Sequence, residues 1–283
     1  MTIDLHMHST ASDGTLSPTE LMRFAAECGC NTVALTDHDT AAGVSEARSE
    51  AHRLGIRFIA GIEVSSLWGG RSIHVVGLGL DPESPGIAGF VAGTQMKRVE
   101  RGRAMDENFA RVGIHGALEG ALHYAENSTS LSRTHFALWL LEKGHVKNYQ
   151  EAFDKYLKPG RPGYARVEWP ATVEAVRFIR EEGGVAVLAH PGRYEFSAEW
   201  MSDQLLEDFK AAGGEAIEVT SGSQSRATDI IFAQKAREMG FLASTGSDWH
   251  SPRSARPSPG MQPALPKDLT PVWVKFGYPR DMD

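Results

Sequence analysis

Histidines and carboxylates recur along this chain of 283 residues, at or near the ends of short apolar runs. His6 and His8 end the first run, and side chains two apart on a strand point to the same face. Two imidazoles could therefore hold one metal ion from a single strand end, although a lone pair of this kind is weak evidence. Because the pattern recurs, we predict one metal centre, with the candidate ligands His6, His8, Asp13, His38, Glu63, His74, His190, Asp248 and His250.

This mixed imidazole and carboxylate set exceeds the needs of one ion. An ion takes roughly four to six ligands, so the set predicts two or three ions, some of them sharing a bridging carboxylate. Glu63 is central in the chain order and is the candidate bridge.

Predicted strands and helices alternate around these ligands. Ser17 can cap a helix that begins at Pro18, with Glu20 completing a capping box. The carboxyl ends of parallel strands form the active-site face of an α/β barrel, so we expect an irregular, parallel barrel of seven strands. The first strand begins at residue 2, and the others are expected at 31–36, 56–62, 72–78, 185–189, 215–219 and 241–245. Helices between them are expected at 41–54, 171–182, 198–212 and 225–239.

One stretch, 85–164, shows helical periodicity without a convincing strand. It is too long for an ordinary crossover, and breaker residues at 158–163 return the chain to the barrel. Helices are expected at 91–112, 117–126, 132–143 and 148–157. We therefore expect a barrel domain over 1–84 and 165–283 and a small helical insertion over 85–164.

Composition narrows the cellular context. A net charge of −7 argues against long-range attraction to a nucleic-acid polymer. No apolar run approaches membrane-spanning length, and a strand at residue 2 leaves no room for a signal peptide. Cys28 and Cys30 are too close in sequence to pair. We expect a reduced, cytoplasmic protein without a membrane or long nucleic acid as partner. Surface or packing roles are expected for His52, His115, His123 and His145.

The ligand motifs together resemble those of the PHP (polymerase and histidinol phosphatase) superfamily. The motifs are His6-Met7-His8-Ser9 with Asp13-Gly14, Thr36-Asp37-His38, Gly61-Ile62-Glu63, His74, Ala189-His190-Pro191 and Gly246-Ser247-Asp248-Trp249-His250. The resemblance spans the barrel part of the chain. It implies a distorted (β/α)7 barrel with a phosphoesterase site of two or three metals.

The resemblance also implies how the ligands are divided. One metal would be held by His6, His8, Glu63 and Asp248, a second by Asp13, His38 and His250, and a third by Glu63, His74 and His190. The family often has histidine where Asp13 stands. A carboxylate makes that position harder and more anionic, which favours Mn²⁺, with Zn²⁺ or Fe²⁺ as alternatives. A metal-activated water would attack phosphorus. Asp13 and His250 are the candidates for protonating the leaving oxygen.

Two segments of the insertion could bind a second phosphate. Lys97 to Arg103 places Arg101 on a basic helix face, although interleaved acidic residues also fit a solvated surface. Ser132 to His135 opens a helix, where free N–H groups favour anions. Arg133-Thr134-His135, and the return segment Gly160–Tyr164 with Trp169, resemble a PHP subgroup that acts on 3′,5′-nucleoside bisphosphates and short RNA. The candidate substrate contacts are Arg101, Arg133, Thr134 and His135.

The favoured function is removal of the 3′-phosphate of a 3′,5′-nucleoside bisphosphate, giving a 5′-nucleotide and phosphate. Alternatives are a 5′–3′ exonuclease acting on short oligoribonucleotides, a histidinol-phosphatase-like phosphomonoesterase, and a metal-bound structural module. A structural module is disfavoured because no expected ligand is missing. Tyr194 could stack on a base, but ordinary loop packing is the favoured interpretation of this residue.

Overall fold

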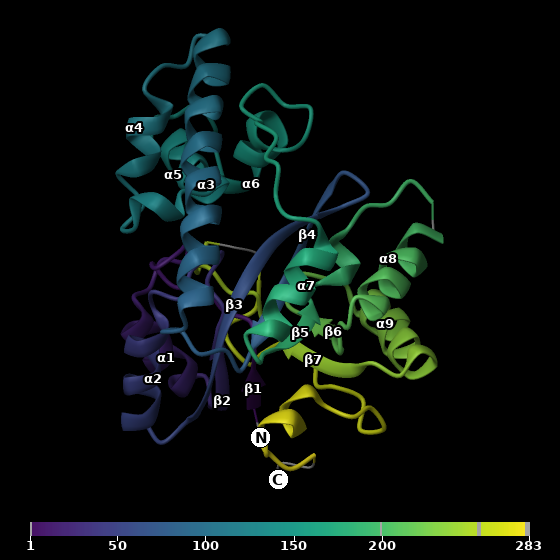
Figure 1. Ribbon diagram of the computed structural model, residues 1–283. Coiled ribbons are helices and arrows are strands. Elements are labelled where there is room, and N and C mark those ends of the chain that lie inside the picture. Colours follow the sequence, from purple (N-terminus) through teal and green to yellow (C-terminus); the bar gives the residue numbers. More distant parts are fainter. Residues whose placement is uncertain (1, 199, 254–255, 281–283) are drawn as a thin grey trace.

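Seven strands lie side by side in chain order and form a nearly closed barrel (Figure 1). The computed structural model describes residues 2–198, 200–253 and 256–280. β1 closes onto the last strand, where the Leu5 N–H donates to the Thr245 carbonyl oxygen at 3.0 Å. The strands are β1 (Thr2–Asp4), β2 (Cys30–Leu35), β3 (Arg57–Trp68), β4 (Arg71–Leu78), β5 (Val185–Leu188), β6 (Ala216–Ser221) and β7 (Leu242–Gly246). The predicted distorted seven-stranded barrel is confirmed.

The expectation of an entirely parallel barrel is wrong at β4. This strand pairs antiparallel with both β3 and β5. Gly69 and Gly70, with φ of 54° and 76°, make a tight hairpin turn where a helix would otherwise stand. Reversal carries His74, near the start of β4, to the rim that holds the ends of the parallel strands, where it pairs with Ser65. Glu63 also differs from expectation, because β3 continues beyond it to Trp68.

Helices pack on the outside of the barrel and bury one face each. In α1 the buried side chains include Leu21, Met22 and Ala25. The Ser17 hydroxyl and the Glu20 carboxylate form the predicted capping box. The outer helices are α1 (Pro18–Glu27), α2 (Val44–Arg53), α7 (Thr172–Glu181), α8 (Trp200–Ala211) and α9 (Arg226–Met239). Among the described residues, no helix combines the length and the apolar character that a membrane span requires.

A group of helices stands above one end of the barrel (Figure 1). They are α3 (Pro85–Arg111), α4 (Ala117–Leu122), α5 (Arg133–Glu142) and α6 (Tyr149–Ala152), followed by a π-helical turn, Phe153–Leu157. These helices share an apolar cluster of their own, which includes Phe109, Phe136 and Leu140. α3 begins at Pro85 rather than at residue 91, and α4 ends earlier than predicted. The division of the chain at 84/85 and 164/165 stays a prediction.

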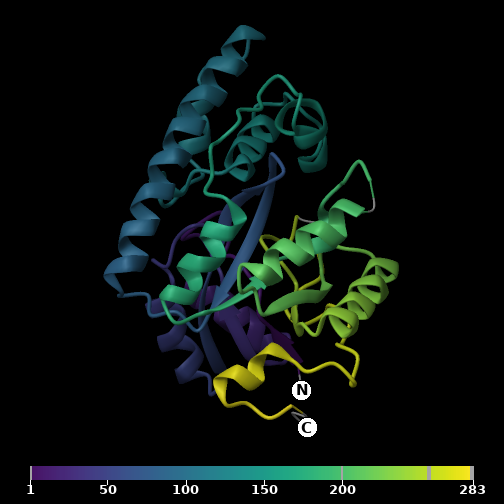
Figure 2. The same ribbon diagram turned by 45° about the vertical axis from the view of Figure 1, so that its right-hand side comes forward.

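The other end of the barrel is covered by the C-terminal segment, which runs beneath the strands in Figure 2. Val272 and Trp273 are buried there, in the cluster that contains Ile3 and Val187. Because this end is filled by apolar side chains, the open end for chemistry is the one that faces the insertion.

Candidate active site

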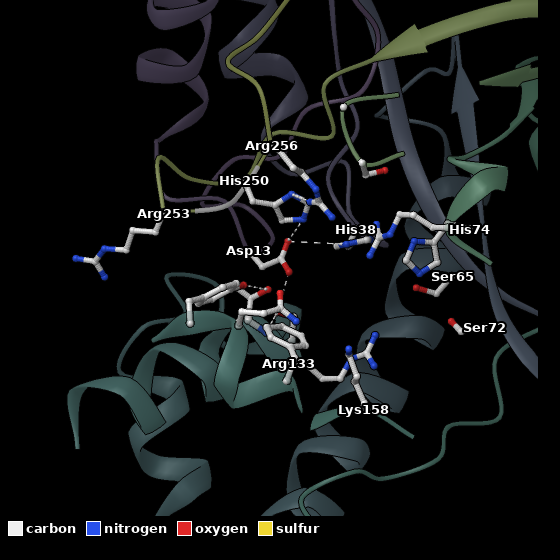
Figure 3. A pocket seen from close by; sticks show the side chains of 18 of the residues that line it. Asp13, His38, Ser65, Ser72, His74, Arg133, Lys158, His250, Arg253 and Arg256 are labelled. Carbon is white, nitrogen blue, oxygen red and sulfur yellow. Dashed lines mark hydrogen bonds and ion pairs between the residues drawn. The ribbon is translucent and has the colours of Figure 1, made fainter. Parts of the chain in front are cut away.

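The structure brings all nine predicted ligands together at the rim that faces the insertion. Six imidazole rings lie in contact, with centroids 4.0 Å apart for His8 and His250 and 5.0 Å apart for His38 and His74. Figure 3 shows Asp13, His38, His74 and His250 converging on one cavity. Their donor atoms fall into overlapping groups: His6, His8 and Asp248; His8, Asp13, His38 and His250; His6, Glu63 and His190; and His38, Glu63 and His74.

Glu63 lies at the centre of these groups. Its Oε1 is 3.0 Å from His190 Nε2 and 2.9 Å from His74 Nδ1. Its Oε2 is 2.7 Å from His38 Nδ1 and 3.4 Å from His8 Nε2. A carboxylate with both oxygens among imidazoles has the geometry of the bridging ligand that the sequence indicates.

Unpaired buried atoms show that the cluster fits metal ions. His8 Nδ1, Asp13 Oδ1 and Glu63 Oε2 are buried and make no hydrogen bond of acceptable geometry, although His38 Nδ1 lies 2.7 Å from Glu63 Oε2. Native proteins rarely leave such atoms unsatisfied, and an ion is one of the standard explanations. Imidazole nitrogens and carboxylate oxygens suit Mn²⁺, Fe²⁺ and Zn²⁺. The residues present therefore fit divalent ions, while the division of ligands among the ions stays a prediction.

The protonation states favour ligand behaviour. Burial opposes ionisation of Glu63, but the charges of His38 and His74 outweigh it and hold the pKa of this carboxyl well below its usual range. The pKa of Asp13 is lowered in the same way, against burial, by His250 and His38. Burial lowers the pKa of His250 to about 4. An ionised Asp13 and a neutral His250 are suited to binding a cation, and their role in proton transfer stays a prediction.

Glu218, on β6, is a functional candidate that spacing did not reveal. Its Oε1 lies 2.6 Å from His6 Nδ1, and its Oε2 accepts the His190 backbone N–H at 2.6 Å. A carboxylate on one imidazole nitrogen fixes the tautomer and directs the other nitrogen toward the metal. The usable signal in the sequence was a glutamate between the apolar residues of a predicted strand. In the structure, the Glu218 side chain is 1% exposed.

Two arginines hold Asp248 from its other side. Arg193 and Arg256 each lie 3.0 Å from Asp248 Oδ2, while Oδ1 lies 3.3 Å from His8 Nε2. One carboxylate oxygen is therefore clamped by guanidinium groups, which leaves the other for the cluster. Neither arginine was predicted, because each comes from a loop with no spacing signal.

Backbone strain concentrates in the same place. Among the described residues, the non-glycine residues with positive φ are Asp39 (51°), His190 (29°) and Asp248 (54°). Such conformations persist where the surroundings enforce them, and they cluster at functional sites. At His190 and Asp248 the enforcing contacts are backbone N–H bonds to Glu218 and to the His6 carbonyl oxygen.

A cationic wall faces the cluster. It is formed by four side chains of the insertion that line the same cavity: Arg98, Arg101, Arg133 and Lys158. Arg98 donates through Nε to Asp39 Oδ2 at 2.9 Å, which fastens α3 to the barrel. The Trp169 ring lies 5.4 Å from the Arg98 guanidinium and 5.5 Å from that of Arg101. Burial, together with the charges of Arg98 and Arg133, lowers the pKa of Arg101 to about 9. Guanidinium groups that lie this close together repel one another, and a bound anion such as phosphate would relieve the repulsion.

Three of the four predicted substrate contacts, Arg101, Arg133 and Thr134, line the cavity. The prediction that His135 contacts the substrate is wrong. It is 2% exposed and absent from the lining, and its Nδ1 accepts the Ser132 backbone N–H at 3.1 Å. It therefore caps α5 rather than contacting substrate. Ser132 also donates its hydroxyl to Asp13 Oδ2 at 2.8 Å and so joins the insertion to the cluster.

Tyr194 packs rather than stacks. Its hydroxyl accepts the His74 backbone N–H at 2.9 Å and donates to the Ala189 carbonyl oxygen at 3.0 Å. The base-stacking interpretation is therefore wrong, and the packing interpretation is confirmed. Two smaller expectations are also confirmed: Cys28 and Cys30 are free thiols, and His52, His115, His123 and His145 have exposed side chains.

The cluster and the cationic wall enclose one cavity of about 650 Å³. Among the described residues, one carboxylate, that of Asp13, lines it. The cationic lining residues are Arg98, Arg101, Arg133, Lys158, Arg193, Arg253 and Arg256. Arg98, Arg193 and Arg256 are already paired with carboxylates, so Arg101 and Arg133 are the cations next to the cluster that are available to an anionic ligand.

Known proteins resemble the chain throughout its length. The PHP domain family matches residues 4–159. A 3′,5′-nucleoside bisphosphate phosphatase of Chromobacterium violaceum is 44% identical over 96% of this chain and 95% of the relative. A 5′-3′ exoribonuclease of Haemophilus influenzae is 38% identical over 96% of this chain and 98% of its own. The structure of an amidohydrolase from Chromobacterium violaceum superposes with a TM-score of 0.93, at 42% identity over 98% of this chain and 96% of that one. This chain belongs to the PHP domain family.

Proposed function

We propose that this protein is a metal-dependent phosphatase that removes the 3′-phosphate of 3′,5′-nucleoside bisphosphates. The products are a 5′-nucleotide and phosphate. One observation carries the proposal: the ligand cluster and the Arg101–Arg133 wall face the same cavity. The similarity to the bisphosphate phosphatase of Chromobacterium violaceum supports it.

The ions are proposed to be two or three Mn²⁺, with Zn²⁺ or Fe²⁺ as alternatives. His6, His8, Glu63 and Asp248 would hold one of them. Asp13, His38 and His250 would hold a second, and Glu63, His74 and His190 a third. Bound ions would supply a water nucleophile of lowered pKa and neutralise the phosphoryl oxygens.

The chain's own residues then have separate tasks. Arg101 and Arg133 bind the phosphate that is not cleaved, and Thr134 orients it from the start of α5. Glu218 and the Arg193–Arg256 pair keep the ligands in place. We propose Asp13 and His250 for the proton transfer. Because Asp13 is ionised and His250 is neutral in the free protein, either one would first take up the proton that the attacking water releases and then deliver it to the leaving oxygen. We also propose a cytoplasmic location, an expectation that comes from the sequence.

A second candidate is 5′–3′ exonuclease activity on short oligoribonucleotides. The exposed Arg253, at the mouth of the cavity, favours it, because this cation could contact a further phosphate. Two exoribonucleases, of Haemophilus influenzae and Salmonella typhimurium, are 38% and 39% identical to the chain. The net charge of −7 disfavours longer polymers.

A substrate panel tests the proposal. Purified, manganese-loaded protein is incubated with adenosine 3′,5′-bisphosphate, histidinol phosphate and a 5′-phosphorylated trinucleotide, and release of phosphate and of 5′-nucleotide is measured. Rapid conversion of the bisphosphate is expected, with loss in Asp248→Ala. Turnover of the trinucleotide as well would add the exonuclease function, and preference for histidinol phosphate would replace the proposal.

A further inference from the structure

We propose that Tyr149 and Phe153 form a nucleobase-binding subsite in the same cavity, an inference that rests on the proposed function. Tyr194 was the candidate from the sequence for this role, but in the structure its hydroxyl is bonded to the backbone of His74 and Ala189. Three aromatic side chains other than histidine line the cavity among the described residues: Tyr149, Phe153 and Trp169. Trp169 already holds two guanidinium groups against its ring, which leaves Tyr149 and Phe153 for a base.

The two rings lie beside the proposed phosphate contacts. Their centroids are 5.3 Å apart, and their planes meet at 57°. The Tyr149 hydroxyl donates to Thr134 Oγ1 at 3.3 Å, next in sequence to Arg133. This bond fixes the aromatic pair one residue from the cation that would bind the uncleaved phosphate. A nucleotide anchored there places its base within reach of the rings.

Local backbone geometry accounts for the position of Phe153 at the cavity. α6 ends at Ala152, and the chain continues as a π-helical turn from Phe153 to Leu157. Turns of this kind are rare and occur often at functional sites. The turn begins at one lining residue, Phe153, and Lys158, another, follows it directly. The widened turn therefore presents an aromatic ring and a cation to the same space.

The chemistry of the pair predicts tolerance toward the base. Both rings are half-buried, at the edge of the apolar cluster of the insertion. Every base has a π face, so stacking gives affinity without choosing among bases. Gln150 is the nearest polar lining side chain in sequence, and its Nε2 donates a hydrogen bond to Asp154 Oδ1 at 3.2 Å. We expect the four nucleoside bisphosphates to be hydrolysed with similar KM.

The test compares a substrate with and without its base. In Phe153→Leu, which keeps an apolar side chain but removes the π face, KM for adenosine 3′,5′-bisphosphate should rise roughly tenfold with kcat little changed. KM for abasic ribose 3,5-bisphosphate should stay as in the wild type. Phe153→Tyr retains an aromatic ring and should therefore have the wild-type KM for the nucleotide. Tyr156→Leu, on the same turn but outside the lining, is the matched control and should leave both substrates unaffected.

A binding measurement separates this subsite from the reaction. The fluorescence of 2-aminopurine riboside 5′-monophosphate should be quenched by the wild-type protein and by Tyr156→Leu, and much less by Phe153→Leu, whether or not any bisphosphate is turned over. Equal loss on the nucleotide and the abasic substrate, or unchanged quenching in Phe153→Leu, would overturn the subsite. Failure of the wild type to hydrolyse either bisphosphate, with quenching intact, would overturn the proposed function and leave the base subsite standing.

Discussion

The barrel rim and the insertion wall face each other across one cavity but are built differently. At the rim, Glu63 and Asp248 are at most 1% exposed, and charged partners surround them on several sides. On the wall, Arg101 has a single carbonyl hydrogen bond, to Leu131 at 3.1 Å, and the exposed Lys158 has one ion pair, to the exposed Asp154 at 2.7 Å. Rigid, desolvated groups suit chemistry, whereas groups with free hydrogen-bonding capacity suit recognition. We infer that the rim sets the reaction and the wall sets the substrate.

Removal of the ions should have the largest effect. Chelation of the loaded protein should lower kcat by roughly a thousandfold or more, because the water nucleophile and the charge neutralisation are lost together. Measured metal content should fall in parallel, and Mn²⁺ should restore both. Full activity in protein shown by elemental analysis to be metal-free would break the assignment of chemistry to the rim.

Glu218→Gln should weaken the rim without removing a ligand. An amide accepts the His6 Nδ1–H more weakly than the carboxylate and makes the ring a weaker ligand, so metal affinity should fall by roughly 10- to 100-fold. Competition with a fluorescent chelator measures this affinity directly. Glu207→Gln, an exposed change on α8, is the control and should bind metal as the wild type does. Unchanged affinity in Glu218→Gln would remove this residue from the site.

Arg101→Ala should affect recognition more than reaction. Loss of one charge-assisted contact to phosphate should raise KM for adenosine 3′,5′-bisphosphate roughly 10- to 100-fold, with metal content unchanged. Arg103→Ala removes an exposed cation from the same helix and should change little. If the two variants behave alike, the basic stretch of α3 is only a solvated surface.

Trp169→Leu should have the smallest effect. The indole contributes cation–π contacts to Arg98 and Arg101, each worth about 0.5–1 kcal/mol near a surface. Since Arg101 alone of these two is assigned to the substrate, KM should rise by roughly two- to fivefold. Trp200→Leu, at an exposed position on α8, should leave KM unchanged. A fall in kcat with constant KM would show that Trp169 serves the rim instead of the wall.

The sequence predicted the rim better than the wall for a physical reason. Ligands such as His6 and His8 repeat with strand spacing, and the barrel brings strand ends together. Glu218, Arg193 and Arg256 act through contacts between distant segments, which spacing does not encode. The direction of β4 was also missed, although the turn glycines Gly69 and Gly70 were a usable signal.

The wall was harder to predict because helix starts serve two purposes. His135 follows Arg133 and Thr134 at the start of α5, so its sequence position fits either a cap or an anion contact. Only the structure shows that its ring bonds to the Ser132 backbone. The aromatic pair of Tyr149 and Phe153 had no signal beyond helical spacing, because a core aromatic residue has the same pattern.

One comparison tests the central claim most directly: kcat/KM for adenosine 3′,5′-bisphosphate against adenosine 3′-monophosphate, in the wild type and in Arg133→Ala. The two substrates share the bond to be cleaved and differ in the phosphate assigned to the wall. The account predicts that the wild type prefers the bisphosphate by roughly 100-fold, and that most of this preference disappears in Arg133→Ala through the bisphosphate alone. Equal kcat/KM for the two substrates in the wild type would contradict the division of labour between rim and wall.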